Sequence, residues 1–180
     1  METISSGETP PIEMEKLLEH LARVTGETTA LAVPNATQAM FVGVHESAFP
    51  IRYTTQIGNC VPMHATAAGR ALLSQLSSAD RLALLRRADY VRYTPNTLMD
   101  PDAIEAEIKQ SINEGYFVGK EEYSPGLMGV ALALPMPARH YALLISGPVD
   151  RLKDRVDEIA REMIAAVREI LAIDLGRREP

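Results

Sequence analysis

The stretch GNCVPMHATAAGRALLSQL, residues 58–76, contains a predicted helix that begins among small residues. Ala65, Ala67, Ala68 and Gly69 stand where a helix that packs in a core usually carries Leu or Ile. Small side chains at a helix start allow close packing on a strand. They also allow an anion to approach backbone N–H groups that have no intrahelical acceptor. The residues alone favour neither explanation, so the rest of the chain has to decide between them.

Upstream of this stretch, the sequence predicts one helix followed by three strands. Residues 12–25 place apolar side chains at helical spacing, and Gly26 is typical of a C-terminal stop. Two apolar segments, 28–34 and 38–46, flank a Pro-Asn-Ala-Thr turn and predict an antiparallel hairpin. Residues 50–57 predict a third strand.

Downstream, two further helices carry clear start signals. Ser77 begins a capping sequence ahead of an apolar and basic segment, residues 81–87. Asp100 is a typical N-cap followed by Pro101 at the first helical position, and Gly115 marks the end of that helix.

The C-terminal third predicts three strands and a last helix. A strand that begins near Tyr116 is interrupted by a loop containing glycine and proline. The apolar segments 129–135 and 140–146 predict the centre of the sheet, and a continuous apolar stripe predicts a helix from about Asp150 to Leu175. Hairpins without βαβ repeats indicate an α+β fold, a mostly antiparallel sheet flanked by helices.

Composition narrows the class of protein. With 180 residues, 46% of them apolar, the chain predicts one globular domain over residues 12–175, with residues 1–11 and 176–180 disordered. No apolar run approaches the roughly 20 residues of a membrane span, and the polar start lacks a secretion signal, which predicts a cytoplasmic protein. The net charge of −6 disfavours direct binding of a phosphate backbone, and a single cysteine excludes an internal disulfide.

The sequence offers little catalytic chemistry. It lacks the common nucleotide-binding, zinc-protease and hydrolase motifs, so we expect neither an enzyme nor a bound cofactor or metal. Cys60 and His64 could form a nucleophile and its base, but Pro62 between them argues against convergence, and a partly buried thiol with a capping or core histidine is the simpler interpretation. Glu121 and Glu122 would face opposite ways on a strand, which favours solvated or loop-anchoring carboxylates.

Several segments together resemble the effector-binding domain of IclR-type bacterial transcription regulators. They are TGETTALAV, PMHATAAGRALLSQL, YTPNTLMD, EGYFVGKEEYSPGLMGVALALP and ISGPVDRL, in that order and spacing. The resemblance extends from about residue 13 to 173 and implies a GAF-like or profilin-like sheet with a small-molecule pocket on one face. Such regulators carry an N-terminal winged helix-turn-helix domain that is missing here, so we expect either a regulatory fragment or a natural protein without a DNA-reading domain.

The resemblance also assigns the ligand-binding residues by position. They are Tyr53, Val61, Ala67, Ala68, Gly119, Leu127, Gly129, Leu144 and Ser146. Family members that sense oxoacids carry an acidic, a thiol and a hydroxyl group where Gly119, Gly129 and Leu144 stand here. We therefore expect a carboxylate effector held at Ala67 and Ala68 that is bulkier and less polar than pyruvate, such as an aromatic acid.

The implied mechanism is allosteric. Effector binding would change DNA binding through the helix at residues 12–25, and the resemblance implies a homodimer or homotetramer, with no membrane contact. Two other interpretations stay open at this point. One is a GAF-like enzyme that uses Cys60 and His64, and the other is an oligomerisation module without a ligand. The effector, the target genes and the sign of regulation are not determined by the sequence.

Overall fold

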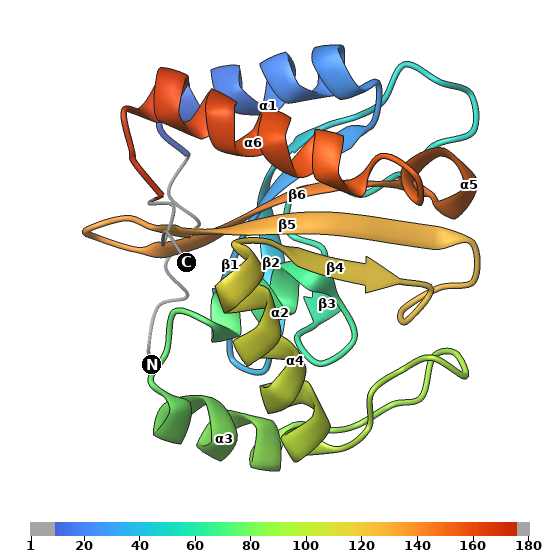
Figure 1. Ribbon diagram of the computed structural model, residues 1–180, viewed down its shortest axis with the longest axis vertical. Coiled ribbons are helices and arrows are strands. Elements are labelled where there is room, and N and C mark those ends of the chain that lie inside the picture. Colours follow the sequence, from blue (N-terminus) through green and yellow to red (C-terminus); the bar gives the residue numbers. More distant parts are fainter. Residues whose placement is uncertain (1–9, 176–180) are drawn as a thin grey trace.

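One antiparallel sheet of six strands, in the order β3-β2-β1-β6-β5-β4, forms the centre of the computed structural model, which describes residues 10–175 (Figure 1). The strands are β1 (Thr28–Asn35), β2 (Gln38–His45), β3 (Cys60–Pro62), β4 (Phe117–Lys120), β5 (Leu127–Pro135) and β6 (His140–Pro148). β1 pairs with β6 and so joins the two long hairpins, with Leu31 opposite Leu143. The predicted α+β class is confirmed. Apart from Pro10 and Pro11, the ends predicted to be disordered lie outside the described residues.

Helices cover both faces of the sheet. α1 and α6 lie side by side on one face, and α2, α3 and α4 lie on the other (Figure 1). The helices are α1 (Ile12–Thr25), α2 (Ala67–Leu73), α3 (Ser78–Arg87), α4 (Pro101–Glu114), the single turn α5 (Val149–Leu152) and α6 (Val156–Leu171).

The two faces of the sheet carry side chains of different size. In β1, Leu31 and Val33 pack toward α1 and α6, whereas Ala30 and Ala32 pack toward α2. The same alternation in β6 places Leu143 toward α1 and α6. The small face allows α2 to lie close to the sheet, which accounts for part of the small-residue pattern at its start.

Gly69 shows how close this packing is. A Cβ atom on Gly69 would lie 2.3 Å from the Cα atom of Met63, so a larger residue would push α2 away from the strand that precedes it. Ala68 and Ala71 are fully buried in the same layer. Close packing therefore explains these three residues.

The local helix signals are confirmed at each predicted position. The side chain of Asp100 accepts a hydrogen bond from the N–H of Ala103, and Gly115 ends α4 with a φ of 90°. The hydroxyl of Ser77 accepts from the N–H of Asp80 at the start of α3. Such signals are short in sequence and depend little on the rest of the fold.

The predicted third strand at residues 50–57 is wrong. This segment is an irregular loop, and the third strand is instead β3, three residues further along. The alternating pattern misleads because Ile51 and Ile57 point into solvent, with 74% and 69% of their surface exposed. Side-chain hydrogen bonds to the carbonyls of Ile51 and Tyr53 hold the loop instead of a neighbouring strand.

The last helix is shorter than predicted and is interrupted. Residues 150–175 were expected to form one helix, but the chain turns at residues 153–155, between α5 and α6, and α6 ends at Leu171. Leu152 is fully buried, and Arg155 leaves the helical region with φ −120° and ψ 10°. Ala172 then adopts a left-handed conformation that ends α6. The apolar stripe in the sequence continues past residues 153–155 and past Ala172, so it does not indicate either change of direction.

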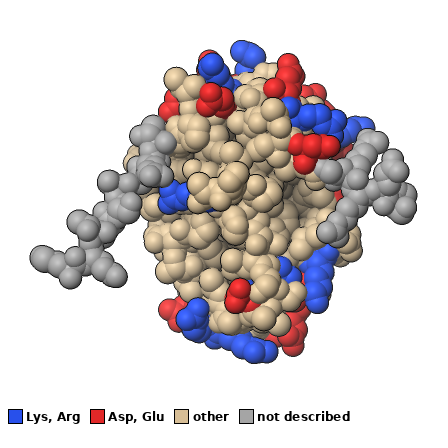
Figure 2. All heavy atoms as spheres, turned by 90° about the vertical axis from the view of Figure 1, so that its left-hand side faces the viewer, with Lys and Arg blue, Asp and Glu red and all other residues tan. Residues whose placement is uncertain are grey.

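Charged side chains gather on the outer sides of the two helical layers. Figure 2 shows the face that is on the left in Figure 1, with Lys, Arg, Asp and Glu at its top and bottom and a largely uncharged band between them. No helix within residues 10–175 is long and apolar enough to cross a membrane.

A buried ion pair fastens α3 to α4. The Arg81 guanidinium donates to both carboxylate oxygens of Glu105 at 2.7 and 2.9 Å, and both side chains are less than 10% exposed. This hydrogen bonding, more than the nearby charges, lowers the pKa of Glu105 below its ordinary value. The pair therefore stabilises the fold at neutral pH.

We expect the contribution of Glu105 to disappear in acid. Because its pKa is lower in the folded than in the unfolded chain, the stabilisation is complete above the ordinary pKa of 4.5 and is lost as the pH falls through the lowered value. Urea unfolding from pH 7 to pH 3 should show the advantage of the wild type over Glu105→Gln shrinking below about pH 4.5. A difference that stays constant over this range would contradict the assignment.

Candidate functional site

A cavity opens at the N-terminal end of α2, beside the small-residue face of the sheet. It encloses about 40 Å³ of space into which the centre of a water molecule fits. The loop 46–57 contributes Tyr53 to its wall, and the loop 121–126 contributes Tyr123. The lining residues are Phe41, Tyr53, Val61, Ala65, Thr66, Ala67, Ala68, Gly119, Glu122, Tyr123, Leu127, Met128, Gly129, Leu144 and Ser146.

The structure brings every residue of the predicted ligand-binding set to this one cavity. These are Tyr53, Val61, Ala67, Ala68, Gly119, Leu127, Gly129, Leu144 and Ser146. Six lining residues were not predicted, namely Phe41, Ala65, Thr66, Glu122, Tyr123 and Met128. Strand alternation in β2 could have indicated Phe41, and capping preference could have indicated Thr66. No local signal identifies Glu122 or Tyr123.

The first turn of α2 presents two backbone donors to the cavity. Thr66 is the N-cap, and its hydroxyl accepts from the N–H of Gly69 at 3.1 Å. Within residues 10–175, no acceptor is hydrogen-bonded to the N–H groups of Ala67 and Ala68, both of which line the cavity. A Cβ atom on Gly119 would lie 3.2 Å from the Ala67 nitrogen. The glycine therefore keeps the space in front of this amide free.

The rest of the wall combines apolar surface with a few hydroxyl groups. Phe41, Val61, Leu127 and Leu144 provide the apolar part. Ser146 lines the cavity as well, and its hydroxyl donates to the carbonyl of Met128 at 2.9 Å, which leaves its oxygen able to accept. The arrangement suits a ligand with an acidic group at one end and an apolar body.

Tyr53 remains a hydrogen-bond donor at neutral pH. Burial raises the pKa of its phenol above the ordinary value; a hydrogen bond with Thr55 lowers the pKa by less than this, and the nearby Tyr123 raises it slightly. A neutral phenol can donate to a carboxylate or to a ligand hydroxyl. Its backbone carbonyl is fixed by the hydroxyl of Thr28, which donates to it at 2.6 Å.

A buried ion pair supports the wall next to the α2 start. The side chain of Arg70 is 1% exposed and donates to both oxygens of Glu122 at 3.0 and 2.9 Å. Arg70 also donates to the carbonyls of His64 and Val118. The pair thus joins α2, the residues before it, β4 and the following loop around one guanidinium.

Glu121 and Glu122 bind different groups and form no carboxylate pair. The Glu121 carboxylate accepts from the N–H of Gly126 at 2.9 Å and closes the loop between β4 and β5. Glu122 binds Arg70. Loop anchoring, one of the two predicted roles, is what the structure places at both positions.

Cys60 and His64 also point to different surroundings. The Cys60 thiol lies near the side chain of Asn35 and the carbonyl of Gly58, whereas His64 is buried with its Nε2 atom 3.1 Å from the carbonyl of Val91. No hydrogen bond within the described residues joins the two. Because Thr66 caps α2, His64 is a core histidine rather than a cap.

Aromatic rings continue from His64 toward the cavity. The His64 ring lies 5.1 Å from that of Tyr90 and 6.0 Å from that of Tyr93. Tyr93 meets the cavity residue Tyr123 edge to face at 5.0 Å. The cluster packs the 88–99 loop against the residues beside the cavity.

Comparison with known proteins identifies the family. Residues 11–172 match the family described as the bacterial transcriptional regulator IclR C-terminal domain. The chain belongs to the IclR family of transcription regulators. It spans 61% of the length of two curated relatives, the HTH-type transcriptional repressor AllR of Salmonella paratyphi A and the acetate operon repressor of Salmonella typhimurium. The match covers the sheet, the cavity and all of the helices described above.

One curated relative is similar to this chain in sequence, and two solved structures share its fold. The acetate operon repressor of Salmonella typhimurium strain LT2 is 36% identical over 167 residues, which cover 90% of this chain and 61% of the repressor. The IclR structure from Thermotoga maritima superposes with a TM-score of 0.83 at 21% identity, covering 92% of this chain and 68% of that one. A double mutant of the PobR inducer-binding domain from Acinetobacter, in complex with 3-hydroxybenzoic acid, superposes with a TM-score of 0.79 at 21% identity, covering 90% of this chain and 97% of that one.

The site contains no arrangement typical of a metal centre. No group of three or more His, Cys, Asp or Glu side chains within residues 10–175 lies close enough together to hold an ion. The cavity lining of this IclR-family domain combines apolar side chains with hydroxyl groups and the Glu122 carboxylate.

Removing the charge of Glu122 should destabilise the domain strongly. Glu122→Gln leaves the buried Arg70 guanidinium without its counter-charge, which costs about 3–5 kcal/mol when a buried pair is broken. Urea unfolding at pH 7 measures the change. The matched control is Glu121→Gln, which alters the neighbouring carboxylate and retains an oxygen that can accept from Gly126. We expect that control to cost less than about 1 kcal/mol, and equal costs for the two variants would contradict a special role for the Arg70 pair.

Proposed function

We propose that this domain senses a small carboxylate effector that is bulkier and less polar than pyruvate, such as an aromatic acid. The observation that carries the proposal is the juxtaposition of two unpaired amides, at Ala67 and Ala68, with an apolar cavity. The amides would bind the carboxylate, and the apolar walls would bind the body of the effector. Tyr53 and Ser146 supply hydroxyl groups for a polar substituent.

Magnitudes favour an effector with substantial apolar surface. An anion at a helix start gains at most about 2 kcal/mol, whereas micromolar affinity requires about 8 kcal/mol. Burying a side chain of the size of Phe contributes about 1.5–3 kcal/mol. A two- or three-carbon oxoacid offers little such area, and the glycines at positions 119 and 129 offer it no side-chain groups to bind.

The fold neighbour PobR suggests a suitable probe. Its inducer-binding domain has been seen with 3-hydroxybenzoic acid, and it shares the fold of this chain. At 21% identity the likeness does not carry the ligand over to this chain, but it makes 3-hydroxybenzoate a reasonable first compound. Its carboxylate, ring and hydroxyl group correspond to the three kinds of surface in the cavity.

In the full regulator, we propose that the effector controls DNA binding by an N-terminal winged helix-turn-helix domain. The acidic domain described here would not contact DNA itself, and α1 would connect the two domains within a cytoplasmic homodimer or homotetramer. A coupling free energy of about 1–3 kcal/mol is enough to change operator affinity roughly five- to 150-fold. The 61% coverage of the curated relatives leaves room for such a preceding domain.

A thermal-shift screen tests the choice of effector. We expect benzoate and 3-hydroxybenzoate to raise the Tm of the domain, because a ligand at a hundredfold excess over its Kd stabilises the fold by about 2.7 kcal/mol. Pyruvate and glyoxylate should raise it much less at equal concentration. Stabilisation by the small oxoacids alone would rule out the aromatic acid, and stabilisation by none of the four would argue against this class of effector.

A single methyl group should block the carboxylate site. In Gly119→Ala, the new Cβ atom would stand 3.2 Å from the Ala67 nitrogen and hinder access to that amide. Calorimetric titration should show the affinity for 3-hydroxybenzoate falling about tenfold or more, which corresponds to about 1.4 kcal/mol. Lys120→Ala, an exposed change on the same strand, is the control and should bind like the wild type. Unchanged affinity in Gly119→Ala would place the acid elsewhere.

A further inference from the structure

The loop 46–57 forms part of the cavity wall although it does not belong to the sheet. It carries Tyr53 to the cavity, yet no neighbouring strand holds it, and much of it is exposed. We propose that the Glu27–Arg151 ion pair is a positioning pair, which fastens this loop so that Tyr53 faces the bound effector. This inference rests on the proposed effector site. Neither residue lines the cavity.

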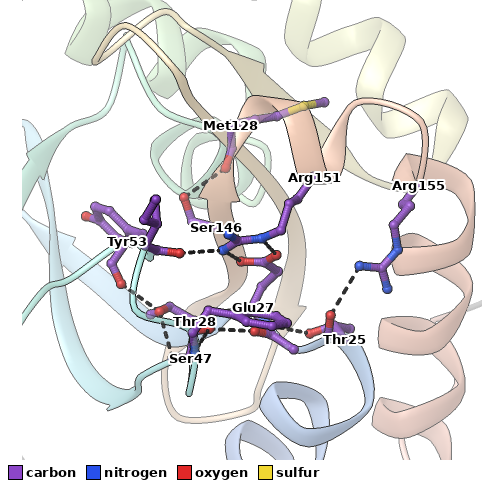
Figure 3. Close-up of polar contacts among 12 residues, drawn as sticks. Thr25, Glu27, Thr28, Ser47, Tyr53, Met128, Ser146, Arg151 and Arg155 are labelled. Carbon is purple, nitrogen blue, oxygen red and sulfur yellow. Dashed lines mark hydrogen bonds and ion pairs between the residues drawn. The ribbon is translucent and has the colours of Figure 1, made fainter.

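The pair joins a buried carboxylate to a guanidinium that is partly exposed. Glu27 lies between α1 and β1 with a side chain that is 0% exposed. Arg151, on α5, donates through Nε and Nη2 to the two Glu27 oxygens at 2.6 and 2.9 Å (Figure 3). A two-pronged arginine contact of this kind fixes the orientation of the guanidinium as well as its position.

Arg151, held in this orientation, also contacts the loop 46–57. Its Nη2 atom also donates to the carbonyl of Ile51 at 2.8 Å, two residues before Tyr53. The ring of Phe49 lies 4.7 Å from the guanidinium carbon and covers it. One cation therefore holds the loop by a directed hydrogen bond and by a stacked ring.

The absence of a side chain at Gly147 leaves space for the buried Glu27 carboxylate. Gly147 follows the cavity residue Ser146 in β6, and a Cβ atom on Gly147 would lie 2.2 Å from an oxygen of Glu27. No side chain at this position fits while Glu27 keeps its place. The same strand thus lines the cavity at one residue and accommodates the ion pair at the next.

A second set of contacts fixes the loop from the neighbouring residue. The Thr28 hydroxyl donates to the carbonyl of Tyr53 and accepts from the N–H of Ser47, so it joins both ends of the loop (Figure 3). Thr28 is paired with Ser146 across β1 and β6. Glu27 and Thr28 together place the loop relative to the cavity floor.

Stability alone does not explain the pair. A buried ion pair can often be replaced by apolar residues without loss of stability, because removing two charges from water is costly. Apolar residues cannot donate to a backbone carbonyl or fix its direction. The hydrogen bond to Ile51 is the contact that an apolar replacement would lose, and it acts on the loop rather than on the core.

The test combines hydrogen exchange with ligand binding in Arg151→Lys. Lysine keeps the positive charge beside Glu27 but lacks the planar fork that reaches Glu27 and Ile51 together. We expect amide exchange in residues 46–57 of the ligand-free domain to accelerate at least about tenfold, as for the loss of one charge-assisted hydrogen bond. Exchange in α1, β1 and β6 should stay as in the wild type. Affinity for 3-hydroxybenzoate should fall by a similar factor.

The control is Lys153→Ala, which removes an exposed ion pair with Asp150 beside Arg151 and leaves Arg151 in place. It should leave loop exchange and affinity nearly unchanged. Unaltered loop exchange in Arg151→Lys, or acceleration spread evenly over the sheet, would overturn the positioning role, as would loop acceleration with full affinity for the probe. If the wild type binds none of the aromatic acids, the proposed effector fails, and the ligand-free exchange of the loop still decides whether Arg151 positions it.

Discussion

The close approach of α2 to the small-residue face of the sheet determines the rest of this domain. Gly69 meets the backbone of Met63, and Ala68 lies in full contact with its neighbours, so this helix sits deeper than a helix of large side chains could. Its N-terminal end consequently opens at the level of the strands. Ala67 and Ala68, whose N–H groups have no hydrogen-bond acceptor among the described residues, line the cavity there. Close packing accounts for Ala68, Gly69 and Ala71, and the access of an anion to the amides of Ala67 and Ala68 is the part of the explanation that we propose.

Segments outside the sheet are fastened by ion pairs in which at least one partner is buried. Arg70 and Glu122 hold the loop after β4, Arg81 and Glu105 join α3 to α4, and Glu27 and Arg151 hold the loop before β3. In each case the guanidinium also donates to a backbone carbonyl of the segment it anchors or of one beside it. Two of the three anchored segments form walls of the cavity. The site is thus built from a rigid sheet and helix on one side and ion-paired loops on the other.

The sequence could predict whatever depends on neighbours in the chain. The caps at Ser77 and Asp100 and the stops at Gly26 and Gly115 were found because their signals span a few residues. The prediction of a strand at residues 50–57 was wrong because alternation of apolar and polar residues does not reveal whether a neighbouring strand is there to pair with. Family resemblance located the cavity residues. The ion pairs could not be predicted, since their partners lie up to 124 residues apart and no local pattern relates them.

The distribution of tyrosines gives this domain an optical property. Tyr53 and Tyr123 line the cavity, and Tyr93 touches Tyr123. Tyr90 and Tyr93 both lie beside His64. Four of the six tyrosines therefore surround one region, in a chain with no tryptophan. Intrinsic emission from the unlabelled domain therefore originates largely beside the cavity. An aromatic guest that absorbs in the same range would quench it by energy transfer, which makes occupancy readable without any attached dye.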